Sequence, residues 1–153
     1  MQHTLKKSVS ISDIGLHSGN IVNITIYPAN VDEGIVFKRV DVTDKENTIP
    51  AKWDSVVDTR LCTVIGNKDA VTVGTIEHLM AAFRGCGIDN ALVEIDAGEV
   101  PVMDGSSQPF VDLFEEVGVQ VQSSPRRAIR ILKEVTYTAV SYTHLTLPTI
   151  CSV

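Results

Sequence analysis

Long apolar runs are missing from this sequence of 153 residues. No stretch approaches the roughly 18 consecutive apolar residues that a membrane-spanning helix needs. Residues 1–13 alternate polar and apolar side chains, where a secretory signal would have an uninterrupted apolar run. The sequence therefore predicts no membrane insertion and a cytoplasmic location.

Basic residues and cysteines are also scarce. The chain has 13 Lys and Arg against 19 Asp and Glu, a net charge of −6, which leaves no basic footprint for a nucleic-acid backbone. Cys62, Cys86 and Cys151 are an odd number without CxxC spacing, so neither a disulfide framework nor a structural zinc knuckle is expected. We expect no nucleic-acid partner, and each thiol is interpreted as buried or incidental.

Apolar residues, by contrast, are abundant enough for a core. They make up 44% of the chain, which excludes disorder, and roughly 150 residues is the usual length of one domain. The sequence shows no repeat with a period of roughly 20–50 residues. One folded domain is the expectation.

Alternation of polar and apolar residues predicts strands in the first half. The strand segments are residues 4–12, 20–27, 34–40, 61–65 and 70–73. In the second of them, Val22, Ile24 and Ile26 share one face. The first three predict an antiparallel meander, and the last two, which flank a turn at residues 66–69, predict a hairpin.

Two segments have helical spacing instead. Residues 76–84 repeat apolar side chains at that spacing, with Thr75 as a candidate N-terminal cap. Residues 107–117 form the second helix, which Gly118 ends. With further strands at residues 90–96 and 128–137, the pattern predicts an α+β two-layer sandwich: a mainly antiparallel sheet with both helices packed on one face.

Residues 139–153 differ from what precedes them, because threonines crowd there and Asp, Glu, Lys and Arg are absent. Residues 140–145 match what one reading frame of a common sequencing-library transposon end would encode. The hypothesis is that a truncated gene reads into adaptor sequence, with a domain of residues 1–138 and an artefactual or disordered tail of residues 139–153. Codons unrelated to that transposon end would contradict it.

The most informative chemical pair is Glu77 and His78, in the first turn of the first predicted helix. A helix N-terminus favours an ionised carboxylate and a neutral imidazole, which are the base and metal-ligand forms. A carboxylate beside a metal-bound water can accept its proton. The alternative is that Glu77 only balances the helix dipole and His78 packs at the helix end.

Other candidate residues carry weaker signals. His17 lies in a Gly-Leu-His-Ser-Gly turn, where a role in binding and a role as a polar turn residue are equally supported. Cys62 has no activating histidine nearby in the sequence and is interpreted as a small buried apolar residue. A catalytic zinc needs three protein ligands, and the chain has no HExxH motif.

Five segments taken together carry a family resemblance. They are residues 14–19 (IGLHSG), 58–63 (DTRLCT), 75–79 (TIEHL), 87–90 (GIDN) and 99–106 (EVPVMDGS). In this order they resemble the N-terminal half of UDP-3-O-acyl-N-acetylglucosamine deacetylases. The resemblance runs from about Thr4 to Tyr137.

The resemblance implies a cytoplasmic zinc amidase that removes the acetyl group from its UDP-sugar substrate in lipid A synthesis. It matches His78 to a zinc ligand and Glu77 to the general base that activates the zinc-bound water. Leu61 and Cys62 match the segment that borders the substrate, and His17 matches a structural or site-adjacent histidine. The implied fold is two related α+β sandwiches, of which this sequence supplies the first.

The resemblance also implies missing parts. The family's other zinc ligands, a His and an Asp on a His-Lys-x-x-x-Asp helix, belong to the second domain, as do most substrate contacts. The chain alone is therefore expected to be inactive. The alternative function is a free-standing, non-catalytic binding module with the same fold.

Overall fold

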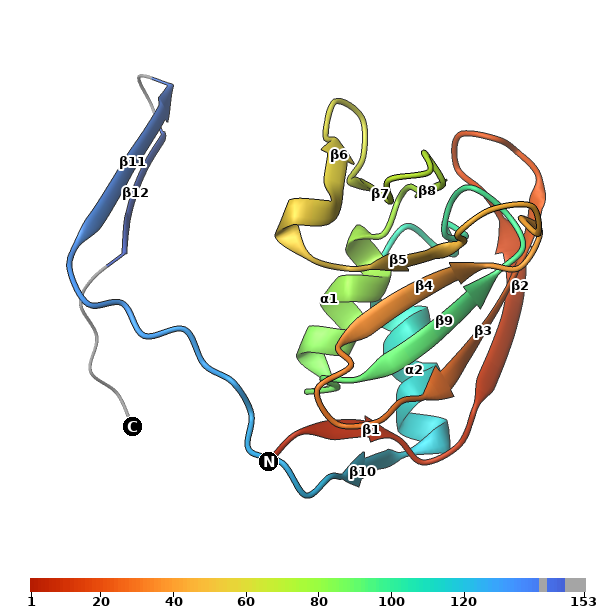
Figure 1. The fold of residues 1–153 in the computed structure, drawn as a ribbon, viewed down its shortest axis with the longest axis horizontal. Helices are drawn as coiled ribbons and strands as arrows, with labels where there is room; N and C mark the ends of the chain where they lie inside the picture. Colours follow the sequence, from red (N-terminus) through yellow and green to blue (C-terminus); the bar gives the residue numbers. More distant parts are fainter. Residues whose placement is uncertain (141–142, 148–153) are drawn as a thin grey trace.

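The computed structural model describes residues 1–140 and 143–147. Its largest sheet has five strands in the order β2-β3-β9-β4-β5 (Figure 1). They are β2 (Val9–Ile14), β3 (Ile21–Pro28), β4 (Ile35–Arg39), β5 (Thr48–Pro50) and β9 (Ala91–Ile95). All neighbouring pairs are antiparallel except β4 and β9, which are parallel.

The position of β9 corrects the predicted meander. β4 does not pair with β3, because β9 lies between them, with Val93 opposite both Ile26 of β3 and Phe37 of β4. Ala91, Val93 and Ile95 are fully buried. A strand with such an apolar inner face is stabilised most in the middle of the sheet, where a neighbouring strand lies along each of its edges.

Two helices cover one face of this sheet. In Figure 1, α1 (Glu77–Gly85) and α2 (Gln108–Val117) both lie behind the strands. The rings of Phe83 and Phe114 stack between them with centroids 4.9 Å apart, and α2 ends at Gly118, whose φ is +77°. This confirms the α+β class, with mostly antiparallel sheets and two helices packed together.

The start of α1 differs from the prediction. Ile76 occupies the N-cap position and no side chain caps the helix. Thr75 has a φ of +56°, and its hydroxyl donates to Glu99 at 3.3 Å. The expected threonine cap is therefore wrong, because Thr75 is turned towards another loop.

A three-stranded sheet lies beside the N-terminal end of α1. It contains β6 (Val56–Asp58), β7 (Val64–Gly66) and β8 (Thr72–Val73), and a 3₁₀ turn at Trp53–Ser55 precedes it. Ile65 of β7 pairs with Val73 of β8, which confirms the predicted hairpin.

The remaining strands form two pairs. β1 (His3–Leu5) pairs with β10 (Val119–Val121), and β11 (Val135–Val140) pairs with β12 (Thr143–Leu147). The β11–β12 hairpin stands away from the sheet and helices in Figure 1. Among the described residues no helix is long and apolar enough to cross a membrane.

The last predicted strand, residues 128–137, is only partly present. β11 begins at Val135, and residues 128–134 form no strand, with Ile129 92% and Leu132 78% exposed. No described strand runs beside them to pair with. The predicted tail, residues 139–153, is only partly within the described residues, and Cys151 lies outside them.

Candidate functional site

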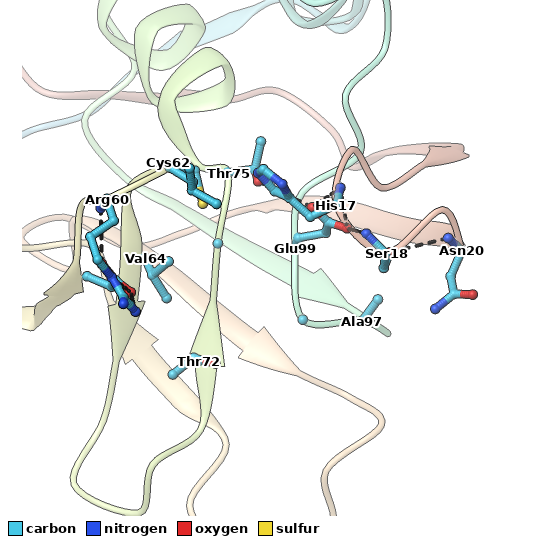
Figure 2. A pocket seen from close by; sticks show the side chains of 14 residues that line it. His17, Ser18, Asn20, Arg60, Cys62, Val64, Thr72, Thr75, Ala97 and Glu99 are labelled. Atoms are coloured by element: carbon cyan, nitrogen blue, oxygen red, sulfur yellow. Dashed lines mark hydrogen bonds and ion pairs between the residues drawn. The ribbon is translucent and has the colours of Figure 1, made fainter.

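A cavity of about 850 Å³ opens beside the start of α1. Its walls are the turn after β2, the loop between β6 and β7, strands β7 and β8, and the loop after β9 (Figure 2). The lining side chains include His17, Arg60, Leu61, Cys62, Thr75 and Glu99. The cavity is therefore made by segments that are distant in sequence.

Glu99 is the buried acid of this cavity. Its side chain accepts hydrogen bonds from the backbone N–H of Ser18 at 2.7 Å and of His17 at 3.1 and 3.2 Å. Figure 2 shows it between Ser18 and Thr75. Burial raises the pKa of the Glu99 carboxyl, but the hydrogen bonds from Ser18, His17 and Thr75 together hold it below its ordinary value.

Thr75 lies two residues before α1 and has a strained backbone conformation. A positive φ is uncommon for any residue other than glycine and is an outlier for a β-branched one, and it costs on the order of 1–3 kcal/mol. In this conformation the hydroxyl of Thr75 donates to Glu99. Strain of this kind gathers at binding and catalytic sites.

Glu77 begins α1 and connects it to the loop that carries Leu61 and Cys62. Its Oε1 accepts the backbone N–H of Thr63. Burial raises the pKa of the Glu77 carboxyl, but the backbone N–H groups of Glu77 and Thr63 lower it further, so that it lies below the ordinary value. The carboxylate is ionised at neutral pH, which is the form that a general base requires.

His78 follows on the same helix turn and is half-buried. The N–H and hydroxyl of Ser106 lower the pKa of the Asp104 carboxyl, and the nearby His78 side chain acts in the same direction. The described residues contain no group of three His, Cys, Asp or Glu side chains placed to hold a metal ion. His78 is thus a candidate ligand that the described residues do not complete to a set of three.

The structure brings some of the predicted site residues together and leaves others apart. His17, Leu61 and Cys62 line the cavity, with Leu61 86% exposed. Glu77 and His78 do not line the described cavity and sit next to it at the helix start. Their link to it is the hydrogen bond from Thr63 to Glu77.

Sequence reasoning missed the role of Glu99 and the ion pair at the cavity rim. Arg60 donates to Asp58 at 2.7 Å and holds the pKa of that carboxyl well below its usual range. The Asp-Thr-Arg spacing was the available signal for this pair. Glu99 is the first residue of the 99–106 segment that carries the family resemblance, but nothing in the sequence around it indicates burial.

Taken together, the fold and site define a class: an α+β domain with an ionised carboxylate and an imidazole at a helix N-terminus, beside a cleft. A model of the LpxC family, described as UDP-3-O-acyl N-acetylglycosamine deacetylase, matches residues 2–150. The chain belongs to this family.

Several curated relatives bear the name UDP-3-O-acyl-N-acetylglucosamine deacetylase. The chain is 48% identical to that of Idiomarina loihiensis over 134 residues, 88% of this chain and 44% of the relative. It is 50% identical to that of Shewanella woodyi over 130 residues, which are 85% of this chain and 42% of the relative. It is 47% identical to that of Vibrio parahaemolyticus over 136 residues, which are 89% of this chain and 44% of the relative. The chain thus spans less than half the length of these relatives.

Proposed function

We propose that this chain is the N-terminal half of a zinc-dependent amidase that deacetylates UDP-3-O-acyl-N-acetylglucosamine in lipid A biosynthesis, in the cytoplasm. The observation that carries the proposal is the placement of Glu77 and His78 at the positive end of α1, next to the cavity that Leu61 and Cys62 line. The names of the relatives, at 47–50% identity, support the substrate.

In this proposal each site residue has one role. Glu77 is the general base, because its carboxylate is ionised and anchored by the N–H of Thr63. His78 supplies one metal ligand. Leu61 and Cys62 contact the substrate, and His17 lies at the edge of the site.

The described residues do not complete a zinc site. Catalytic zinc takes three protein ligands in addition to an open position, and the described part of the chain has no cluster of three suitable side chains. Zinc chemistry would therefore require ligands from a second domain, which supports the expectation that the 153-residue chain alone is inactive.

The division into residues 1–138 and a non-family tail of residues 139–153 remains part of the proposal. The alignments with the relatives span 130–136 residues, whereas the family match extends to residue 150. The nucleotide sequence across codons 137–153 tests the division.

A second candidate function is a free-standing binding module. The formed cavity is the observation that favours it. A genomic stop codon soon after Tyr137 would support this alternative. A continuing frame that encodes His-Lys-x-x-x-Asp would support the truncated enzyme.

The direct test restores the missing half. Residues 1–138 are fused to the C-terminal part of the Idiomarina loihiensis deacetylase, and acetate release from UDP-3-O-acyl-N-acetylglucosamine is measured with zinc present. We expect activity in the fusion, and background turnover in the 153-residue chain. Glu77→Gln should lower kcat by about 10²–10⁴-fold, and His78→Ala should also lower the zinc content.

His3→Ala is the matched control, because His3 lies on β1, outside the residues that line the cavity. It should leave the activity of the fusion unchanged. A folded, zinc-loaded fusion without acetate release would overturn the proposed function. Robust turnover by the unfused chain would overturn the proposal that it is incomplete.

A further inference from the structure

Glu99 is a buried carboxylate to which the proposed reaction assigns no role. It is 7% exposed and accepts hydrogen bonds from two separate segments. The backbone N–H groups of His17 and Ser18 donate from the turn after β2. The hydroxyl of Thr75 donates from the residue that leads into α1.

The backbone around Glu99 contacts the same two segments. Gly74 donates to the carbonyl of Gly98 at 2.9 Å, and Val100 donates to the carbonyl of Gly74 at 3.0 Å. On the other side, Val102 donates to the carbonyl of Ile14 at 2.9 Å. Residues 98–102 therefore run between the turn and the helix start, and the Glu99 carboxylate reaches both.

Gly15 makes room for this carboxylate. A Cβ atom at position 15 would overlap Glu99 Oε1 and would lie 2.8 Å from its Cδ and 2.6 Å from Ser18 Oγ. Any larger residue at position 15 would therefore have to displace the Glu99 carboxylate from its hydrogen bonds. The hydrogen-bond donors to Glu99 among the described residues are all uncharged, so they hold it in place without an ion pair.

We propose that Glu99 is a positioning residue that fixes the His17 turn relative to the start of α1. Thr75 is the link, since it bonds to Glu99 and stands two residues before Glu77. The roles given to Glu77 and His78 rest on the proposed function. The positioning itself is a property of the fold and is tested without activity.

The test uses NMR spectra of the labelled 153-residue chain. In Glu99→Gln, we expect the ring resonances of His17 and His78 to shift together, and the amides of His17 and Ser18 to exchange about tenfold faster or more. The ring of His3, on β1, should not move. A change at His17 without one at His78 would overturn the coupling.

Two further variants separate positioning from general loss of structure. Glu94→Gln removes a charge from β9, where Glu94 pairs with Lys38 at 2.9 Å, and should leave the rings of His17 and His78 unchanged. Glu99→Asp keeps the charge but shortens the side chain. It should retain the contact with one of the two segments, so that the ring resonances of either His17 or His78 return to their parent positions. An effect identical to that of Glu99→Gln would count against the proposal.

Thr75→Val keeps the branched shape at position 75 and removes only the hydroxyl bond. It should shift His78 in the parent chain and have no added effect in a Glu99→Ala background, because that variant leaves no acceptor for the hydroxyl. Equal effects in both backgrounds would overturn the proposal. Failure of the fusion assay would leave these spectra unchanged, so the two proposals fail independently.

Discussion

Asp89 shows how a single residue joins distant parts of the chain. Its Oδ2 accepts the backbone N–H of His3 at 2.8 Å, and its carboxylate pairs with Arg126, with Oδ1 2.7 Å from the Arg126 Nε. Burial raises the pKa of the Asp89 carboxyl, but the hydrogen bonds from Arg126 and His3 lower it below the ordinary 3.8. The ionised form therefore stabilises the contact between the chain start and the segment after β10.

The expected result is a pH-dependent loss of stability. At pH 7, Asp89→Asn should lower the free energy of unfolding by about 1.5–3 kcal/mol, because bonds to a charged acceptor are weakened. Since the folded-state pKa lies below the unfolded value near 3.8, the contribution of Asp89 is present above about pH 4 and is lost as the pH falls through the folded-state pKa. The difference in the free energy of unfolding between the parent and Asp89→Asn should therefore narrow below about pH 4.

Urea unfolding from pH 7 to pH 3 measures this gap. Asp54→Asn, on the exposed 3₁₀ turn, is the control for removing one negative charge and should change stability little at any pH. A gap between Asp89→Asn and the parent that stays constant below pH 4 would contradict the assignment.

At the residue level the sequence was informative where the signal is local. Glu77 and His78 are adjacent and lie at a helix start that periodicity predicts, so their common location followed directly. Glu99 was not recognised, because its burial depends on the close approach of Gly15 from 84 positions away in the chain. Likewise, the positive φ of Thr75 is not a conformation that a β-branched residue prefers, so the local sequence could not indicate it.

At the level of elements, the helix pair depends on aromatic packing. Phe83 of α1 and Phe114 of α2 are each at most 1% exposed and stack on one another. Such pairs contribute beyond the area that they bury. The two helices therefore form one layer held at this contact.

Phe83→Ala should destabilise the fold by about 3–5 kcal/mol, because it leaves a cavity between α1 and α2. Trp53→Ala is the matched control, since Trp53 is also aromatic but 89% exposed. Its effect should stay within about 0.5 kcal/mol. Thermal unfolding followed by far-UV circular dichroism compares them, and similar losses for both would contradict the packing described for Phe83.

The elements also show which predictions sequence patterns support. Both helices begin and end within about a residue of the predicted bounds, because helical spacing and the glycine at position 118 are local signals. The order of strands was wrong, because nothing near β3 or β4 indicates that a later strand separates them. Residues 128–134 include three large apolar residues, yet a strand also needs a neighbour with which to pair.

For the whole molecule, the segment after β10 exposes apolar side chains. Ile129 is 92% and Leu132 78% exposed, and Val121 of β10 is 62% exposed. Where such side chains form a contiguous patch, they favour association. The whole chain is therefore expected to self-associate.

Sedimentation velocity over a range of concentrations tests this expectation. The mean mass of the parent should rise with concentration, and Ile129→Ser combined with Leu132→Ser should reduce the rise. Ile21→Ser, at a site on β3 that is 71% exposed, is the control and should behave like the parent. A constant monomer mass for the parent would contradict the expectation.

The central place of β9 also has a consequence for synthesis. β4 ends at Arg39, but β9, which separates it from β3, begins only at Ala91. Synthesis on the ribosome proceeds at roughly 5–20 residues per second. The edges of β3 and β4 that pair with β9 therefore stay open for several seconds before β9 is synthesised. A nascent chain that stops short of Ile95 therefore cannot close its main sheet, and during this interval a chaperone would bind the open edges of β3 and β4.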